Sequence, residues 1–586
     1  KVLGEIQTDY SFYKSQAERE SFRTMANKAD KMVRCSRLRA TADKQYDDVR
    51  SNVATTAIWQ RNMTVTSNEN SIYFPASGDM PVSYLPIDGD QAYKQEEGQR
   101  IGAQKNLLLQ YTFEEDGMQE KIKDSVFFLN KYANQMYAIE WAEERKQVTE
   151  RVPNKRDDEG NVISFKWKDS SKIVKSNPTL RKINWDNIWF DARIEDMRKQ
   201  SSMIEKSLPC ISELWTAQAN GQIMNVEKLT QSALSDGGDE ESIPLQSRQT
   251  NAGEGTSVGS PSTLFDEFNC WKKAPIKIDK DGKAEWDPEG TVPTWWWCTF
   301  LGNLDGQPIC TRLKPNPYFH GETPYKWVHS HRDDKGAYHM GMVNLVESLY
   351  EELMTSVNQA IDVKTKMNRA SWVTRKGNLL GVEFKFGGNE IIYTRSAPTA
   401  DTLRQVEVKD HTGTFNNMYD RTLNELDAAM NTGKAIIGEA LGSRTSASEA
   451  QQVFDQAFKT LMDKARYQAD QLFPWMAEMI EALWEQYSDP KRVVAITSEG
   501  MMHEVKPAEL FGRFHYKVTA IDKFDNDVTR RSEQNQFFQV FLEDLRQAAG
   551  PKGMRVLLEE LLKDRGITDN VSSILAGTSN ADAERV

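Results

Sequence analysis

The side chains best suited to chemistry lie in one turn-rich stretch, which holds four of the seven histidines of the chain: His320, His329, His331 and His339. Imidazole nitrogens ligate transition metals, and the nearby Asp333-Asp334 pair could supply carboxylates to a two-metal hydrolytic centre. The spacing of acids around these histidines does not by itself make a metal site, because solvated turns carry the same residue types. We therefore predict no metal site, and we keep a metal-dependent nuclease or hydrolase that uses residues 329–339 as an alternative function.

Other signatures of enzymes are weak. The chain contains no GxxxxGK[ST] phosphate-binding loop, so we expect it not to hydrolyse ATP as a motor. It also contains no HExxH zinc motif. Its five cysteines include no CxxC pair, which argues against a zinc ribbon. The run Trp295-Trp296-Trp297 could stack on bases, but successive strand residues face opposite sides of a sheet, so burial in a core or an interface is the better interpretation. We predict a protein without a cofactor and without enzymatic activity.

Composition limits the class of protein. With 586 residues, of which 39% are hydrophobic and 27% charged, the chain can bury more than one core. No apolar run reaches the roughly 18 residues of a membrane helix, so we expect no membrane partner. The chain begins at Lys1 without a methionine or an apolar signal segment, and we expect the native start to lie upstream.

The net charge is −12, and the isoelectric point is about 5.4. A protein that binds DNA on its own is more often basic, because cations must neutralise the phosphates. An acidic chain can still handle DNA if the duplex has to slide past it and must not be held tightly.

Residue periodicity predicts an α+β chain that begins with helices. Helices are expected over residues 8–65, 91–116 and 118–138, followed by a hairpin over 141–173. Residues 183–198 should form a strand that ends at Asp191 and then an acidic helical start. A helix is expected over 203–220, and the Ser/Gly-rich segment 234–262 should be a mobile loop.

Two long helices around a small β module dominate the middle of the chain. Strands over 268–313, with a hairpin turn at Asp305-Gly306, precede them. The first helix should run from Met342 to Arg369, with apolar residues three or four apart that bury one stripe. The module after it is too small for a core of its own, so it would gain by pairing with neighbouring copies.

The longest helical pattern covers residues 446–487 and starts at a capping box formed by Ser446 and Glu449. Pro474 predicts a kink near residue 470. Strands should follow over 492–522, and two further helices over 530–563.

Taken in order, these segments resemble the portal, or head-to-tail connector, proteins of tailed double-stranded DNA bacteriophages, especially the podovirus-like group. The resemblance covers residues 180–490 best. It rests on an ordered set of segments: NIWFDARIEDMR at 187–198, the Trp-started β region, Asn316 to Pro324 in the form Asn-Pro-Tyr-x-x-Gly-x-x-Pro, Asn358-Gln359-Ala360-Ile361-Asp362, and GEALGSRTSASEA at 438–450.

The resemblance implies a mainly helical multi-domain fold that assembles as a ring, usually of twelve subunits, around an axial DNA channel. The parts would be a wing at 1–341 and 447–529, stem helices at 342–369 and 412–431, a clip at 370–411, a tunnel loop at 432–446 and a crown at 530–586.

The resemblance also implies which residues meet DNA and partners. In the tunnel loop, Lys434 and Arg444 would lie near the DNA backbone, together with Glu439, and contacts of this kind weaken with salt. The channel wall and stem would carry Glu425, Asp427, Lys364, Lys366 and Arg369, and the clip would present Arg375, Lys376, Lys385 and Arg395. Without the resemblance, the loop is a helix end with Gly433 at the left-handed C-cap position.

The function implied is a non-enzymatic channel at one capsid vertex through which DNA is packaged and ejected. The implied partners are the terminase large subunit, a tail adaptor, and the major capsid and scaffolding proteins. The protein would be assembled in the host cytoplasm and reside in the virion. A virion scaffold protein without a DNA channel is kept as a second alternative.

Overall fold

The structure is a computed structural model. It describes residues 1–36, 51, 53–75, 80–86, 95–156, 162–228, 264–278, 284–333, 336–368, 371–373, 404–406, 410–432, 447–489, 492–498, 501–507, 510 and 514–519. The chain forms two compact units. The first comprises Lys1–Met25, Thr66–Gly341 and Lys459–Val586, and the second comprises Ala26–Val65 and Met342–Phe458. None of the helices in the described ranges combines the length and the hydropathy that crossing a membrane requires.

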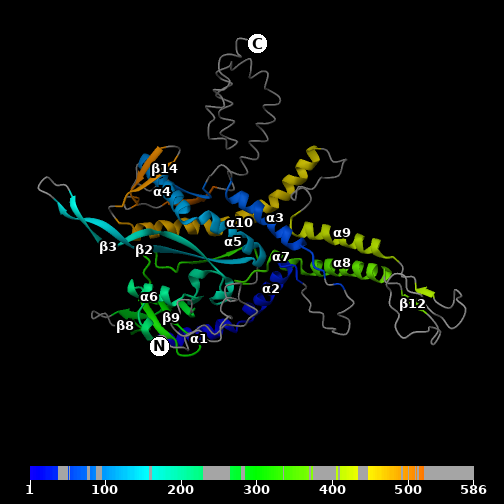
Figure 1. Cartoon of the computed structure of the whole chain (residues 1–586), viewed down its shortest axis with the longest axis horizontal. Helices are drawn as coiled ribbons and strands as arrows, with labels where there is room; N and C mark the ends of the chain where they lie inside the picture. The colour runs from blue at the N-terminus through cyan, green and yellow to red at the C-terminus, as the bar shows by residue number, and fades with distance from the viewer. Residues whose placement is uncertain are drawn as a thin grey trace, which may run out of the picture. The chain divides into compact units, whose positions relative to one another are not determined.

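Helices and sheets are mixed along the chain, so the predicted α+β class is confirmed (Figure 1). The helices are α1 Val2–Lys14, α2 Ala17–Val33, α3 Ala57–Tyr73, α4 Gln95–Asp116, α5 Met118–Tyr132, α6 Ile211–Ala219, α7 Met342–Leu345, α8 Glu347–Asn368, α9 Thr412–Ala429 and α10 Ala447–Tyr487. The strands are β1 Val82–Pro86, β2 Asn134–Arg156, β3 Val162–Ile183, β4 Ile188–Trp189, β5 Ser202–Ser207, β6 Glu267–Ala274, β7 Ile276–Ile278, β8 Ala284–Trp286, β9 Thr294–Leu301, β10 Ile309–Pro315, β11 Tyr325–His329, β12 Ser371–Val373, β13 Arg404–Val406, β14 Val494–Ser498, β15 Met501–Val505 and β16 Phe514–Val518.

A five-stranded antiparallel sheet with the order β10-β9-β6-β5-β4 holds one core of the first unit. One of its faces packs against α1, where Tyr10 meets Trp189 and Phe268 edge to face. The three consecutive tryptophans belong to β9 and alternate as predicted. Trp296 joins the core beneath α1, whereas Trp297 stacks on Trp271 with ring centroids 5.4 Å apart. They therefore do not form one platform for bases.

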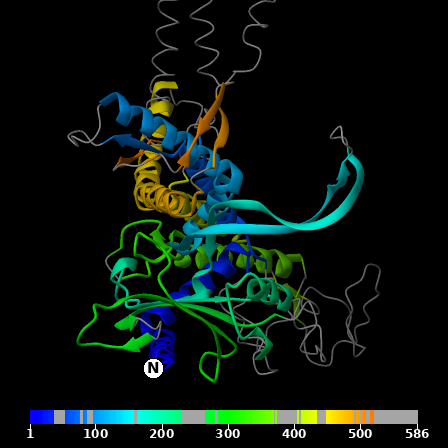
Figure 2. The same ribbon diagram turned by 90° about the vertical axis from the view of Figure 1, so that its left-hand side faces the viewer.

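The predicted hairpin at 141–173 is confirmed and is longer than expected. β2 and β3 pair antiparallel from Met136 opposite Ile183 to Arg156 opposite Val162, and β11 adds a third strand at the base. Helix α5 packs on the base of these strands. Figure 2 shows the rest of the ribbon as a curved extension beyond the helices. Trp167, near the far end, is exposed, so this arm presents an aromatic ring to solvent.

Helix α10 anchors the C-terminal part of the first unit. Apolar residues that recur at helical spacing along α10 are buried, among them Leu461, Met476 and Leu483. The helix continues through Pro474, and the kink near residue 470 stays a prediction. The Ser446 cap lies outside the described residues. The predicted strands at 492–522 are confirmed as β14, β15 and β16.

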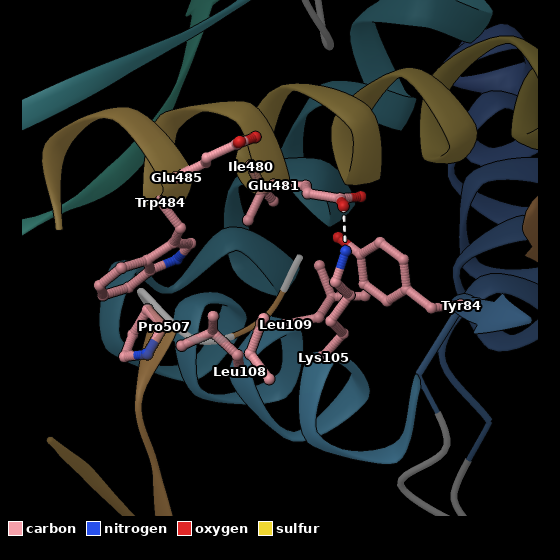
Figure 3. Close-up of a pocket in the computed structure, with 10 residues that line it drawn as sticks. Tyr84, Lys105, Leu108, Leu109, Ile480, Glu481, Trp484, Glu485 and Pro507 are labelled. Atoms are coloured by element: carbon pink, nitrogen blue, oxygen red, sulfur yellow. Dashed lines mark hydrogen bonds and ion pairs between the residues drawn. The ribbon is translucent and has the colours of Figure 1, made fainter. Parts of the chain in front are cut away.

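A small cavity of about 20 Å³ marks where α4, β1 and α10 meet (Figure 3). Lys105 of α4 forms an ion pair with Glu481 of α10, and the Lys105 ammonium also lies 4.2 Å from the ring centroid of Phe514. The indole nitrogen of Trp484 donates to Thr112 Oγ1 at 2.9 Å. These contacts give α10 a polar attachment beside its apolar face.

Two expectations for the first unit are wrong. The helix expected over 203–220 is strand β5 followed by α6. Pro209 separates the two elements because the residue before a proline disfavours helical geometry. The acidic helical start after Asp191 forms turns and the short 3₁₀ segment 197–199. Asp191 and Asp196 each accept the backbone N–H two residues on, and this competes with helix formation.

Candidate functional site

The candidate site is the helix pair of the second unit. Helices α8 and α9 lie side by side, and the short antiparallel ladder of β12 and β13 lies beyond the ends where α8 finishes and α9 begins (Figure 1). The two long helices around a small β module are thus confirmed. The first helix is interrupted near its start, since α7 ends at Leu345 and α8 begins at Glu347.

The predicted apolar stripe of α8 is buried only in its first half. Val346, Tyr350 and Leu353 are fully buried, whereas Val357 and Ile361 are only partly buried. The stretch of α9 nearest β13 is also open, and Met418 is exposed there. Within the described part of the chain, the helix pair is therefore least covered next to the β module.

A polar motif in α8, Asn358 to Asp362, binds the chain segment that precedes α3. Asn358 Oδ1 accepts the Val53 backbone N–H at 2.8 Å, and its Nδ2 donates to the Val53 carbonyl oxygen at 2.9 Å. Asp362 Oδ1 accepts the Ser51 backbone N–H at 2.7 Å. Both residues lie off the apolar stripe of α8, on a face where side chains ordinarily meet solvent. They instead supply partners to backbone groups that have no strand or helix of their own.

Helix α9 is attached to α3 by a buried ion pair. Arg61 Nε lies 2.6 Å from Asp427 Oδ1, and both side chains are about 10% exposed (9% and 10%). The hydroxyl of Thr432 also donates to Asp427 at 3.2 Å. The helix ends with Asn431 at φ 54°, where the N–H groups of Asn431 and Thr432 bond back to Ala428 and Asp427. Asn431, and not Gly433, therefore holds the left-handed C-cap position, since asparagine tolerates this conformation.

The structure places few of the predicted DNA- and partner-contacting residues. Lys364 is exposed on α8, and Lys366 belongs to the same helix. Glu425 is exposed on α9 and pairs with Arg421 at 3.0 Å. The charge of Asp427 is balanced within the chain by Arg61. The other predicted residues lie outside the described residues: Arg369, Arg375, Lys376, Lys385, Arg395, Lys434, Glu439 and Arg444.

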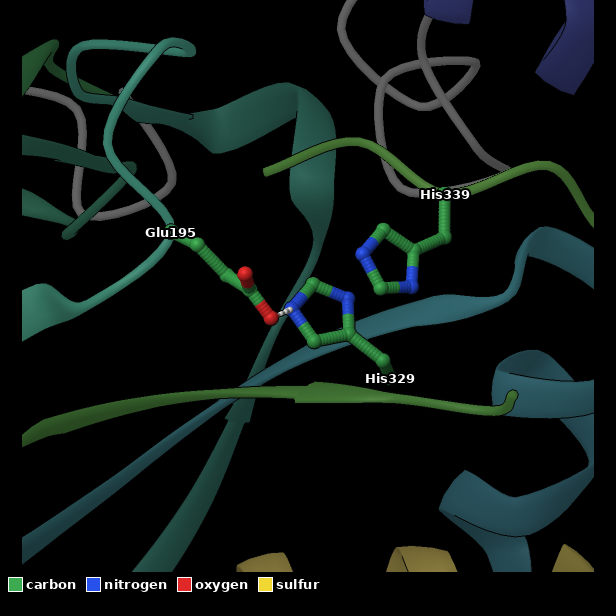
Figure 4. Close-up of side chains that lie close together, drawn as sticks. All are labelled: Glu195, His329 and His339. Atoms are coloured by element: carbon green, nitrogen blue, oxygen red, sulfur yellow. Dashed lines mark ion pairs between the residues drawn. The ribbon is translucent and has the colours of Figure 1, made fainter. Parts of the chain in front are cut away.

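The histidine-rich stretch lies in the first unit and is better organised than its spacing indicated. His329 ends β11, and its ring stacks on that of His339 with centroids 3.7 Å apart (Figure 4). Glu195, from the turn after β4, brings a carboxylate oxygen within 3.6 Å of His329 Nε2. Sequence reasoning missed Glu195 because it lies far from the histidines in the chain. Asp333, considered as a ligand before, accepts the Met340 backbone N–H at 3.2 Å.

Asp191, two residues after the end of β4, organises the turn that carries Glu195. Its carboxylate accepts bonds from the Arg193 side chain at 2.9 and 2.6 Å and from Gln16 at 2.9 Å. The Arg193 hydrogen bonds outweigh burial and lower the pKa of Asp191 to about 2 from its ordinary 3.8. The charged carboxylate is thus favoured by folding.

This pKa predicts an acid-labile contribution to stability. Because the folded-state pKa of Asp191 is depressed, its contribution is complete above pH 4 and is lost as the pH falls toward 2. We expect Asp191→Asn to lower the melting temperature at pH 6, and the gap from wild type to narrow between pH 4 and 2. Differential scanning calorimetry across this range measures the gap. In a protein that already carries Arg193→Met, the difference in melting temperature caused by Asp191→Asn should be smaller than in wild type. A difference that does not change with pH would contradict the assignment.

The amino-acid sequence matches a known protein family over most of its length. A family model described as "Phage SU10 portal protein" matches residues 104–576. The chain belongs to this family. The match runs from within α4 past β16 and includes both helices of the candidate site, and it confirms the resemblance to podovirus-like portal proteins. No curated protein matches the chain. The helix pair is accordingly part of a phage portal protein.

Proposed function

We propose that the chain forms a ring of about twelve copies at one capsid vertex and serves as the channel for packaging and ejecting double-stranded DNA. The observation that carries the proposal is the family match over residues 104–576, joined to an antiparallel helix pair that is open beside a small β module. In this ring α8 and α9 are the stem, 370–411 the clip, 432–446 the tunnel loop and 530–586 the crown.

The incomplete burial of the helix pair supports assembly with further copies. Met367 and Met418 are exposed, and Val357 and Ile361 are half-covered by the described residues. An apolar surface of this kind is stabilised when an identical neighbour covers it, and repetition about an axis closes a ring. The stem helices then form a tube whose rigidity comes from contacts between copies.

Electrostatics support a channel that guides DNA without holding it. The net charge of −12 makes a ring of such chains strongly acidic, which limits tight binding to phosphates. We assign Glu425 and Glu439 to the wall, with Lys364, Lys366 and Arg369 as its cations. We do not assign Asp427 to the wall, because its charge is balanced by Arg61. The Asp427–Arg61 ion pair instead holds α9 against α3.

Partner binding is assigned to the clip. Arg375, Lys376, Lys385 and Arg395 would contact the terminase large subunit during packaging and a tail adaptor afterwards. The ATP is hydrolysed by the terminase, and the portal itself carries no catalytic step. The wing and crown would face the major capsid and scaffolding proteins.

The decisive experiment joins assembly to DNA retention. We expect wild-type protein to form rings of about twelve copies by native mass spectrometry and electron microscopy. Lys434→Glu with Arg444→Glu should assemble equally well but retain less packaged DNA, because two cations per copy near the phosphates are replaced by anions. Packaging assays with nuclease protection measure the retained DNA.

Lys14→Glu with Lys199→Glu is the matched control, because it makes the same charge change at two exposed lysines outside the proposed channel. We expect normal rings with DNA retention close to wild type. Monomeric wild-type protein would refute the ring. Normal retention by the double variant would remove Lys434 and Arg444 from the DNA contacts. Cleavage of DNA by the purified chain with added metal would favour the nuclease alternative, and a solid assembly without an axial channel would favour the scaffold alternative.

A further inference from the structure

We propose that Glu195, His329 and His339 form a binding site for one divalent transition-metal ion of the zinc type, with one carboxylate oxygen and two Nε2 atoms as ligands. A carboxylate oxygen of Glu195 and one ring nitrogen of each histidine lie within 4.8 Å of one another. The residues come from three separate segments of the first unit, namely the turn after β4, the end of β11 and the connection before α7 (Figure 4). The inference is independent of the ring.

The hydrogen bonds around the rings decide where their protons lie. Asn134 Nδ2 donates to the carbonyl oxygens of Tyr132 and His339 at 3.0 and 2.8 Å. Its Oδ1 is thereby the acceptor, and it lies 3.0 Å from His329 Nδ1. The carbonyl oxygen of His331 lies 2.9 Å from His339 Nδ1. Both Nδ1 atoms must therefore donate, which leaves a lone pair on each Nε2 in the neutral rings.

Fixing a histidine through Nδ1 is the arrangement by which proteins prepare Nε2 for a metal. Here two rings are fixed in this way, one by a side-chain amide and one by a backbone carbonyl. Figure 4 shows a nitrogen of each ring turned to the side on which Glu195 lies. Both proposed imidazole ligands therefore have Nδ1 occupied by a hydrogen bond and Nε2 available for a metal.

The Nε2 atoms also lack the partners that a purely structural role would provide. His339 Nε2 is buried and has no hydrogen-bond partner among the described residues. His329 Nε2 faces a Glu195 oxygen at 3.6 Å, which is too long for a hydrogen bond. A lone pair and a carboxylate that face each other repel, and a buried unpaired nitrogen costs free energy. A cation between these three atoms would relieve both penalties.

The chemistry of the ligand set selects the class of metal. Two imidazoles and one carboxylate suit Zn²⁺ and its neighbours in the first transition row, whereas Mg²⁺ and Ca²⁺ prefer oxygen ligands alone. Three protein ligands leave a fourth position for water. A bound ion would clamp the turn after Asp191 to the connection between β11 and α7.

Binding must also move the ligands. Ligands of a tetrahedral zinc ion lie about 3.4 Å apart, given bonds of about 2.0–2.1 Å. The ion must approach each ring in its own plane, and the two planes are now only 16° from parallel. We expect the rings to tilt apart and Glu195 to swing inward, which its mostly exposed side chain (57%) permits.

The test uses the full-length, tag-free protein dialysed against Zn²⁺ alone. Plasma mass spectrometry should find about one zinc per chain, and Co²⁺ in its place should give the visible absorption of a tetrahedral site. Glu195→Gln should weaken zinc binding by roughly tenfold or more, and His339→Asn should abolish it. Two matched controls, Asp196→Asn beside Glu195 and His320→Asn in the turn before β11, should bind zinc as wild type does.

Circular dichroism shows whether each variant is folded. If His339→Asn does not fold, Glu195→Gln still tests the proposal, because Glu195 is largely exposed and its substitution should not disturb the fold. Chelation should lower the melting temperature of wild type and leave that of Glu195→Gln almost unchanged. Substoichiometric zinc in the wild type would overturn the proposal. So would equal zinc affinity of wild type and Glu195→Gln.

Discussion

Asp427→Ala should open the attachment between α9 and α3, and it carries the largest effect we expect in the second unit. The substitution leaves the buried Arg61 guanidinium bonded to the Ala57 carbonyl oxygen at 3.2 Å but without its carboxylate partner. Removing one member of a buried ion pair costs about 3–5 kcal/mol, because the remaining charge is desolvated without compensation. Hydrogen exchange of the α9 amides should accelerate by roughly two to three orders of magnitude.

Glu425→Ala is the matched control, since it removes an acid two residues away on the same helix. Glu425 pairs with Arg421, but both side chains are solvent-exposed, at 47% and 80%, so we expect exchange rates close to those of wild type. Asp427→Leu combined with Arg61→Met should recover much of the loss, because an apolar pair can replace a buried ion pair. Equal exchange rates in Asp427→Ala and Glu425→Ala would show that the buried ion pair stabilises α9 no more than the exposed pair does.

Lys464→Met should have the largest effect in the first unit, where three helices share one buried polar cluster. Lys464 Nζ of α10 lies 3.0 Å from Glu69 Oε1 of α3 and donates to Asn130 Oδ1 of α5 at 2.6 Å. Asn130 in turn donates to the other Glu69 oxygen at 2.5 Å. The methionine fills a similar volume but leaves the Glu69 carboxylate charged and unpaired, so we expect a loss of about 3–5 kcal/mol.

Calorimetric melting of the purified protein measures this loss as a lower melting temperature. Lys459→Met changes an exposed lysine of the same helix and should stay within about 0.5 kcal/mol of wild type. Glu69→Gln added to Lys464→Met removes the stranded charge and should restore part of the melting temperature. No restoration in this double variant would indicate that lost packing, and not the unpaired carboxylate, causes the effect.

Local patterns predicted the elements of the candidate site well. The long helices around a small β module, the β2–β3 hairpin and the strands around the consecutive tryptophans all follow from periods of two or of about 3.6 residues. The prediction failed at 203–220, where a helix was expected and β5 followed by α6 is found. A strand of six residues that is buried on both faces has no clear period, and the bonds of β5 to β6 decide its form.

Side-chain roles were harder to predict than elements. Asn358 and Asp362 belonged to a polar face by their spacing, and the chain segment 51–53 that they bind is far away in the sequence. Asn431 took the cap position expected for Gly433, because the helix ended two residues earlier than the glycine required. The residues next to Asn358, Asp362 and Asn431 in the sequence predict neither the binding of segment 51–53 nor the position of the helix end.

The sequence by itself determined the order of the segments, and with it the membership of the portal family, because order and periodicity are properties of the chain alone. Only the tertiary structure decided that Asp427 is neutralised by Arg61 and that Glu195 faces His329 and His339. The reason is physical. Burial and the pairing of charges depend on which distant segments fold against one another, and a local pattern reports only which face of an element is apolar.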